Sequence, residues 1–389
     1  MRRPQPATDK VLPDNRPLHA KRRLIVFGLG VATFLLFQVL LFLPGLTDTL
    51  FGRVFNPPVV WVLSRSTGIF PFSVAELLIV GYVTSTLVFM LRAMMSLARR
   101  RRSPTNALRS TGLVVLRDLG AIVFLFYTVW GFNYARPPLY ERLGWPEFAP
   151  PDSAELLTIT EESIRNVNGA YLALHGTEDV GYPTPVPDLA ELNAAIDEGY
   201  ARAAELLELP ASIGRRYGPV KQPFLSLLLA QFGIAGMYSP WTGESHVVPQ
   251  PMVYRAYTMG HEKAHQRGVN PELEASFLGY LATSLAPNPL ARYSAAFYAH
   301  GRLLRLLRGE DRRRLSAKRL AGVERDRRDL NEWWEQFEGP AEAVGTAIND
   351  RFLRTNRVAG GVRNYNLVVR LLVEFHRQNG SLDPAADSP

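Results

Sequence analysis

The chain has 389 residues, a net charge of +8 and no cysteine. Without thiols it can form no disulfide, no cysteine nucleophile and no thiolate metal site, so any metal centre must use histidine and carboxylate ligands. The positive charge does not indicate nucleic-acid binding, because much of it flanks long apolar segments in the N-terminal third, where basic residues report membrane orientation. The chain is long enough for a membrane domain and one substantial further domain.

Three apolar segments are candidate membrane spans. Residues 24–46 carry no charge, follow Lys21, Arg22 and Arg23 directly, and are long enough to cross a bilayer core of about 30 Å as a helix. We interpret this segment as a retained anchor, because no small-residue cleavage site follows it. The second span is expected at residues 72–97. The third, residues 112–132, has charged residues near its start and aromatic residues after it that suit a membrane interface.

The basic residues predict the orientation. The tail before the first span holds seven Lys or Arg residues and an arginine block follows the second span, whereas the loop between the first two spans holds only Arg53 and Arg65. Because positively charged loops stay in the cytoplasm, the N-terminus is predicted to be cytoplasmic. We therefore expect a cytoplasmic tail (1–23), a membrane domain in the bacterial cytoplasmic membrane (24–133) and an extracytoplasmic domain (134–389).

The extracytoplasmic domain is predicted to be mainly α-helical. Apolar periodicity and capping residues predict helices at 153–174, 188–209, 223–231, 254–267, 271–286, 289–307, 311–337, 340–355 and 365–378. Residues 233–248 break this pattern, and we expect an edge strand at 244–248 to which a substrate could add as a further strand. A plain connecting loop is the alternative. His246 is expected to be a loop or surface histidine and not a metal ligand.

The string HEKAH contains His261, Glu262 and His265. On a helix, residues four apart share one face, so both imidazoles can bind one metal ion while Glu262 points at its water. After the second histidine, Gly268 suits the end of one helix, and Asn270 suits the N-cap of the next, with proline at its first position. The sequence therefore predicts two helices that meet at a short corner.

The paired histidines followed by a corner resemble the motif of the zinc peptidases called gluzincins. In gluzincins, a glutamate after the corner supplies the third ligand. Glu274, in the first turn of the second helix, is the expected ligand, and Glu272 is the fallback. An alternative is that both acids only complement the helix dipole. The chain departs from the gluzincin pattern at Lys263, where an apolar residue is usual, and at Leu278, where an aspartate often follows the third ligand by four residues.

Longer strings extend the resemblance. They are WGFNYARPPL, GIAGMYSPWTGE, HEKAHQRG, ELEASFLGYLA, ARYSAAFYA, RFLRTN and GGVRNYNLVVRLL. Through them the chain is identified as a member of the bacterial domain-of-unknown-function 3810 family, whose members resemble membrane-anchored zincins of the gluzincin type. The resemblance implies a zincin-like fold and peptidase chemistry but no physiological role.

The expected chemistry is peptide hydrolysis. Zinc held by His261, His265 and Glu274 would activate water, and Glu262 would act as the general base. Tyr293 and Tyr365 are candidate donors to the oxyanion, although each could instead be an aromatic core residue.

Two functional classes are kept open. One is an active membrane-anchored metallopeptidase that cuts a protein or peptide of unknown identity outside the cytoplasmic membrane. The other is a zinc-binding sensor or scaffold that retained the fold without turnover, which the intact general base disfavours. An intramembrane protease is a poor match, because the residues around the motif are too polar to span a bilayer.

Overall fold

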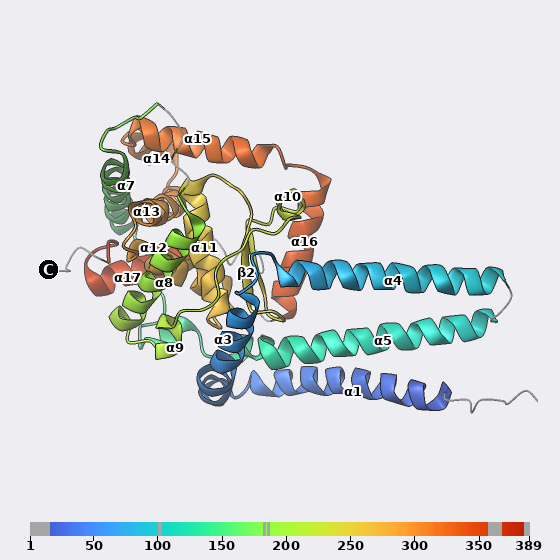
Figure 1. The fold of residues 1–389 in the computed structure, drawn as a ribbon. Coiled ribbons are helices and arrows are strands. Elements are labelled where there is room, and N and C mark those ends of the chain that lie inside the picture. The colour runs from blue at the N-terminus through green and yellow to red at the C-terminus, as the bar shows by residue number, and fades with distance from the viewer. Residues whose placement is uncertain (1–15, 100–102, 182–183, 185–186, 357–367, 385–389) are drawn as a thin grey trace, which may run out of the picture. The chain divides into compact units, whose positions relative to one another are not determined.

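The computed structural model describes residues 16–99, 103–181, 184, 187–356 and 368–384. This part of the chain is mainly helical (Figure 1). Three helices are long and apolar enough to cross a membrane: α1 (Arg16–Leu40), α4 (Val74–Ala98) and α5 (Pro104–Val129). Only 6% to 17% of each apolar window is buried, as expected for helices that contact lipid. The three expected apolar helices are thus confirmed.

The first apolar helix ends earlier than expected. It stops at Leu40 and not at residue 46, because Pro44 starts the separate short helix α2 (Pro44–Thr47). Proline favours the first turn of a helix and cannot continue a preceding one. Two further helices follow α2 without a break, the π-helical η1 (Asp48–Phe55) and α3 (Asn56–Thr67).

The chain divides into two compact units, Met1–Val39 with Val83–Thr128 and Leu40–Tyr82 with Val129–Pro389. In the first unit, α1 and α5 approach closely at Gly30 and Gly120. A Cβ atom built on either glycine would overlap the backbone of the other helix. Small residues at such crossings allow close helix packing within a bilayer.

The second unit contains the segment between the first two apolar helices. Its α3 contacts the last residue of α5, because the Asn56 amide donates to the Val129 carbonyl at 2.6 Å. It also contacts the sheet region, since the Lys221 ammonium donates to the Thr67 carbonyl at 2.8 Å. Nothing in the local sequence of this loop indicates that it folds together with residues far along the chain.

The remaining elements of the second unit follow in chain order. They are η2 (Gly131–Ala135), α6 (Leu139–Arg142), α7 (Ser153–His175), α8 (Leu189–Leu206), α9 (Ala211–Gly214), α10 (Ser226–Gln231), β1 (Gly236–Ser239), β2 (Glu244–Val247), α11 (Met252–Gln266), α12 (Glu272–Ser284), α13 (Pro289–Leu304), α14 (Gly309–Ser316), α15 (Ala321–Glu335), α16 (Pro340–Thr355) and α17 (Val368–Asn379).

The helix expected at 311–337 is two helices, α14 and α15. Asn168 of α7 explains the interruption, because its side chain accepts from the Leu320 amide at 3.1 Å and donates to the Lys318 carbonyl at 2.8 Å. These bonds satisfy backbone groups that a continuous helix would have used internally. The contact joins residues about 150 positions apart, so the local sequence does not reveal it.

The sheet corrects the expected edge strand. A strand forms at Glu244–Val247, antiparallel to β1 with Gly236 opposite Val247. Its other side is also paired, because Lys221 donates to the Ser245 carbonyl and accepts from the Val247 amide. Among the described residues β1 is therefore the edge, and β2 lies buried between two partners.

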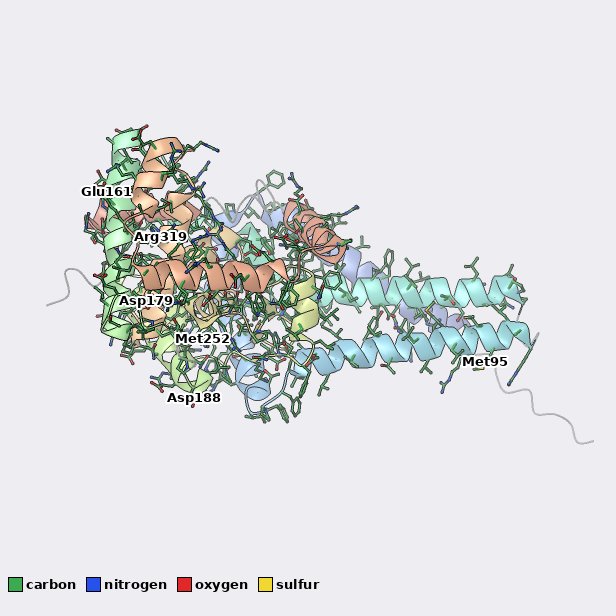
Figure 2. The ribbon with its side chains drawn as sticks, turned by 90° about the horizontal axis from the view of Figure 1, so that it is seen from above. Met95, Glu161, Asp179, Asp188, Met252 and Arg319 are labelled. Carbon is green, nitrogen blue, oxygen red and sulfur yellow. The ribbon has the colours of Figure 1, made fainter. Side chains whose placement is uncertain are left out.

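Helix α11 lies in the interior of the second unit, surrounded by α8, α12 and α13 (Figure 1). In Figure 2, Met252 marks the buried start of α11 and Asp188 the exposed start of α8. Asp188 caps α8 as its position predicts, accepting from the Ala190 amide at 2.9 Å. The core thus encloses the helix that carries the HEKAH string.

Candidate metal site

The two histidines of α11 face one another across one helical turn. His261 and His265 are both buried, and their ring centroids are 4.8 Å apart. Gly260 and Gly279 allow α12 to pack tightly against this turn, since a Cβ atom on Gly279 would lie 2.7 Å from the His261 amide nitrogen. A larger residue there would push α12 away from the histidines.

The corner between α11 and α12 forms largely as predicted. Helix α11 ends at Gln266, and Gly268 adopts the left-handed conformation (φ 77°) of a helix-stopping residue. The next helix, however, starts one residue later than expected. Pro271 is extended and serves as the N-cap, while the Asn270 amide instead donates to the Trp130 carbonyl at 3.2 Å.

The structure brings Glu272, and not Glu274, to the histidines. The Glu272 Oε2 atom lies 3.1 Å from His261 Nε2 and 3.5 Å from His265 Nε2. The Glu274 carboxylate has other partners, because it accepts from the Leu139 amide at 2.8 Å and pairs with Arg142 at 2.7 Å. The carboxylate placed to serve as a third ligand is therefore the fallback residue, Glu272, and not the expected Glu274.

The donor atoms fit a single metal ion. One ligand atom each from His261, His265 and Glu272 lie within 4.8 Å of one another, and all three side chains are buried. In a tetrahedral site with bonds of about 2.0–2.1 Å, ligand atoms are roughly 3.3 Å apart, which the two distances to the carboxylate bracket. The Glu272 Oε2 atom is also buried without a well-directed hydrogen bond from the described residues. Two imidazoles and one carboxylate form a donor set typical of zinc.

Each histidine is oriented by a contact to its other ring nitrogen. His265 Nδ1 lies 2.7 Å from the Val269 carbonyl, and His261 Nδ1 lies 3.3 Å from the Ser276 hydroxyl. Such contacts fix the ring and leave Nε2 of each histidine for the shared site. Ser276 follows Glu272 by four residues, the spacing at which gluzincins often carry an aspartate. Four residues after Glu274 the chain has Leu278, which cannot play this part.

Burial and mutual attraction shift the pKa values of these groups. Burial favours a neutral Glu272, but the positive charge of His265 and the contacts with both rings outweigh it, so the pKa of Glu272 lies well below its ordinary value. Burial likewise disfavours a charged His265, yet Glu272 outweighs it and raises the pKa of His265 to about 9. The pKa of His261 is lowered, mainly by burial. The ionised form of Glu272 is therefore favoured, and a carboxylate can bind a cation.

Glu262 lies between the histidines and the edge strand. A Cβ atom built on Gly236 of β1 would be 2.5 Å from Glu262 Oε1, so only a glycine leaves room for this carboxyl group. Burial, with a smaller contribution from the charge of Glu272, raises the pKa of Glu262 to about 8. The Ser245 hydroxyl of β2 donates to the Glu262 carbonyl at 3.0 Å and ties the helix to the sheet.

The two tyrosines expected to donate to an oxyanion have different outcomes. Tyr293 is fully buried and donates to Asp326 at 2.7 Å, so the structure gives it the role of a core residue. Tyr365 lies outside the described residues. Among the described residues, Tyr257 has its ring centroid 6.3 Å from that of His261, and Tyr257 stacks on Tyr298.

Two further residues singled out in the sequence are buried. Lys263, at a position where an apolar residue is usual, is fully buried and pairs with Asp197 at 2.9 Å. His246 is a buried residue of β2 and not a surface histidine. Its Nε2 lies 2.9 Å from the Ser73 hydroxyl and its Nδ1 lies 3.1 Å from the Met237 carbonyl, so it stands outside the metal-site group.

These features define a mainly helical protein with three helices long and apolar enough to span a membrane and with a buried His-His-Glu group beside a further buried glutamate. The chain belongs to the family described as "Protein of unknown function (DUF3810)", whose sequence pattern matches residues 51–373. The match includes the His-His-Glu group and most of the segment between α1 and α4. No curated protein and no solved structure was found to match the chain.

Proposed function

We propose that this protein is a membrane-anchored zinc metallopeptidase with a zincin-like arrangement around α11. The observation that carries the proposal is the buried convergence of His261, His265 and Glu272 on one point. Both imidazoles are held by contacts at Nδ1, and both Nε2 atoms lie beside the same oxygen of Glu272. A cluster with a purely structural role would not require this arrangement.

The roles of the residues follow from their positions. His261, His265 and Glu272 would hold the metal. When bound, zinc supplies positive charge that polarises a carbonyl group, makes nearby water acidic and lowers the pKa of Glu262. The Glu262 carboxylate then accepts a proton from water and delivers it to the leaving amine. Its burial excludes bulk water, which would otherwise exchange that proton.

The edge strand supports a peptide as substrate. Strand β1 pairs on one side with β2, and Gly236 at its start lies against Glu262. An extended peptide that adds to β1 would have its backbone beside the proposed base, and main-chain hydrogen bonds would hold it with little dependence on its side chains. The substrate is accordingly proposed to be an extended segment of a protein or peptide.

We also propose the orientation predicted by the basic residues. Residues 40–73 and 130–389 belong to one compact unit, which supports placing both on the same side of a membrane. Two crossings, α4 and α5, separate them, which agrees with this placement. Reporter fusions after Arg102 and after Tyr140 test the topology, and they should report the cytoplasmic and the extracytoplasmic side respectively. Activity on the same side would contradict three crossings.

The proposed function is tested with the full chain purified in detergent. We expect about one zinc per chain, and hydrolysis of unstructured peptides that a chelator stops and zinc restores. Glu262→Gln should retain the metal and lose about 10²- to 10⁴-fold in turnover, the usual contribution of a general base. Equal hydrolysis by both forms would refute the mechanism. Metal bound by a native form that cleaves no peptide would favour the non-catalytic sensor or scaffold.

A further inference from the structure

Helix α10 and the residues before it expose large apolar side chains. Phe224 is 86% exposed, and Leu225, Leu227 and Leu228 are each about half exposed (47%, 55% and 51%). The segment 223–232 has no charged residue. Contiguous exposed apolar side chains of this size are uncommon on a water-facing surface and indicate contact with a partner or a membrane.

A second exposed apolar stripe lies on α16. Val344, Ile348 and Phe352 follow one another at intervals of four residues, so they share one face of the helix. Their exposed fractions are 52%, 64% and 39%. Residues 343–349 carry no charge, which leaves this face without the polar residues that usually cover a surface helix.

The two helices are neighbours, as Figure 1 shows. A Cβ atom on Gly345 of α16 would overlap the Phe232 carbonyl that follows α10, and one on Gly233 would lie 3.1 Å from the Glu342 side chain. We group the exposed apolar side chains of these neighbouring elements as the α10–α16 surface: Phe224, Leu225, Leu227, Leu228, Val344, Ile348 and Phe352.

Each end of this surface contacts a residue near the end of a proposed membrane helix. At one end, the Glu76 carboxylate in the first turn of α4 accepts from the Phe224 amide at 2.9 Å and from the Leu225 amide at 2.6 Å. At the other, the Phe352 ring lies 6.3 Å from the ring of Tyr134, which follows the end of α5 by five residues. The surface thus continues from the start of one span to the exit of the next.

We propose that the α10–α16 surface contacts the lipid bilayer, in the leaflet where α4 begins. Its continuity with both spans favours lipid over a second protein copy, because side chains fixed this close to the ends of spanning helices meet the acyl-chain boundary. The absence of charge in the 223–232 and 343–349 segments has the same explanation.

The contact also locates the proposed edge strand. Only residues 232–235 separate α10 from β1, so Gly236 lies within about 18 Å of the end of α10 even if the chain is fully extended. On the other side, the Trp130 indole, one residue after α5, donates to the His265 carbonyl at 3.3 Å. Both routes place the His-His-Glu group close to the membrane surface.

The experiment uses the cysteine-free full chain in nanodiscs. Single variants Phe224→Cys and Ile348→Cys carry an environment-sensitive fluorophore, which is quenched either by nitroxides in the upper acyl chains or by aqueous iodide. Leu87→Cys on α4, where the native side chain is 61% exposed, is the lipid-facing control. Ala317→Cys, exposed beyond the end of α14, is the water-facing control. Thermal unfolding shows that each labelled variant is folded.

We expect lipid nitroxides to remove most of the fluorescence at positions 224 and 348, as at 87, and iodide to quench only the label at 317. Iodide quenching at 224 and 348 without lipid quenching would overturn the proposal. So would protection from both quenchers, which would show that a second copy or another part of the protein covers the surface. Lipid contact at only one of the two positions would overturn the joint surface.

Discussion

The choice between Glu272 and Glu274 gives the sharpest test of the site. Glu272→Gln removes the carboxylate that, among the described residues, lies within 3.5 Å of both histidines, and Glu274→Gln removes a carboxylate that faces Arg142 and Leu139. The two substitutions are chemically identical and two residues apart. We expect the first to abolish tight metal binding and the second to spare it.

The magnitudes follow from the contacts. Loss of a partner that only orients a ligand costs 10- to 100-fold in metal affinity, so loss of the ligand itself should exceed about 100-fold. Glu274 and Arg142 are 2.7 Å apart, with side chains only 4% and 10% exposed. Breaking a buried pair costs about 3–5 kcal/mol, and the glutamine oxygen can still accept from the Leu139 amide, so we expect a loss of about 3 kcal/mol.

The assay combines competition for zinc with a chromophoric chelator and denaturant unfolding in the presence of excess chelator. The chelator removes the contribution of bound metal to stability, so the unfolding experiment compares the metal-free proteins. A Glu274→Gln variant that loses zinc while Glu272→Gln retains it would refute our assignment of the ligands. If neither variant changed zinc affinity, the site would not be a metal site.

Three further predictions concern single side chains. Tyr293→Phe should lower the free energy of unfolding by about 1–3 kcal/mol through the lost bond to Asp326, with turnover unchanged; a fall in turnover at unchanged stability would restore its catalytic role. Gly236→Ala should retain zinc but lower peptide turnover by about 10²-fold, because the new methyl group displaces the Glu262 carboxyl; full activity would show that Glu262 acts elsewhere. Burial lowers the pKa of His300 to about 4 from the ordinary 6.5, so the unfolded chain binds more protons as the pH falls from 6.5 to 4 and stability decreases by roughly 3 kcal/mol. His300→Gln should flatten this decrease in urea unfolding at a series of pH values, and an unchanged slope would contradict it.

Local pattern determined a large part of the structure. The apolar helices follow from uncharged runs, because the length of a spanning helix is set by the bilayer and is visible in composition alone. The facing of His261 and His265 follows from helical periodicity, and the end of α11 follows from Gly268, whose positive φ suits glycine. Each of these depends on residues within a few positions of one another.

The third ligand depended on the tertiary structure. Successive helix residues are about 100° apart, so Glu272 and Glu274 point to nearly opposite sides and only one can face the histidines. Sequence reasoning placed the helix start one residue too early and selected the wrong side. The pairing of Glu274 with Arg142, 132 positions away, decided the matter. Ser276 shares the face of Glu272 and could have been found once Glu272 was chosen.

The sequence by itself determined the three helices long and apolar enough to span a membrane and one helical face with two histidines and a glutamate, because both are local patterns. Only the tertiary structure decided which carboxylate joins the histidines, that β1 and not β2 is the edge, and that residues 40–82 pack with the site. Those outcomes depend on contacts between residues tens to hundreds of positions apart, and local periodicity does not contain that information.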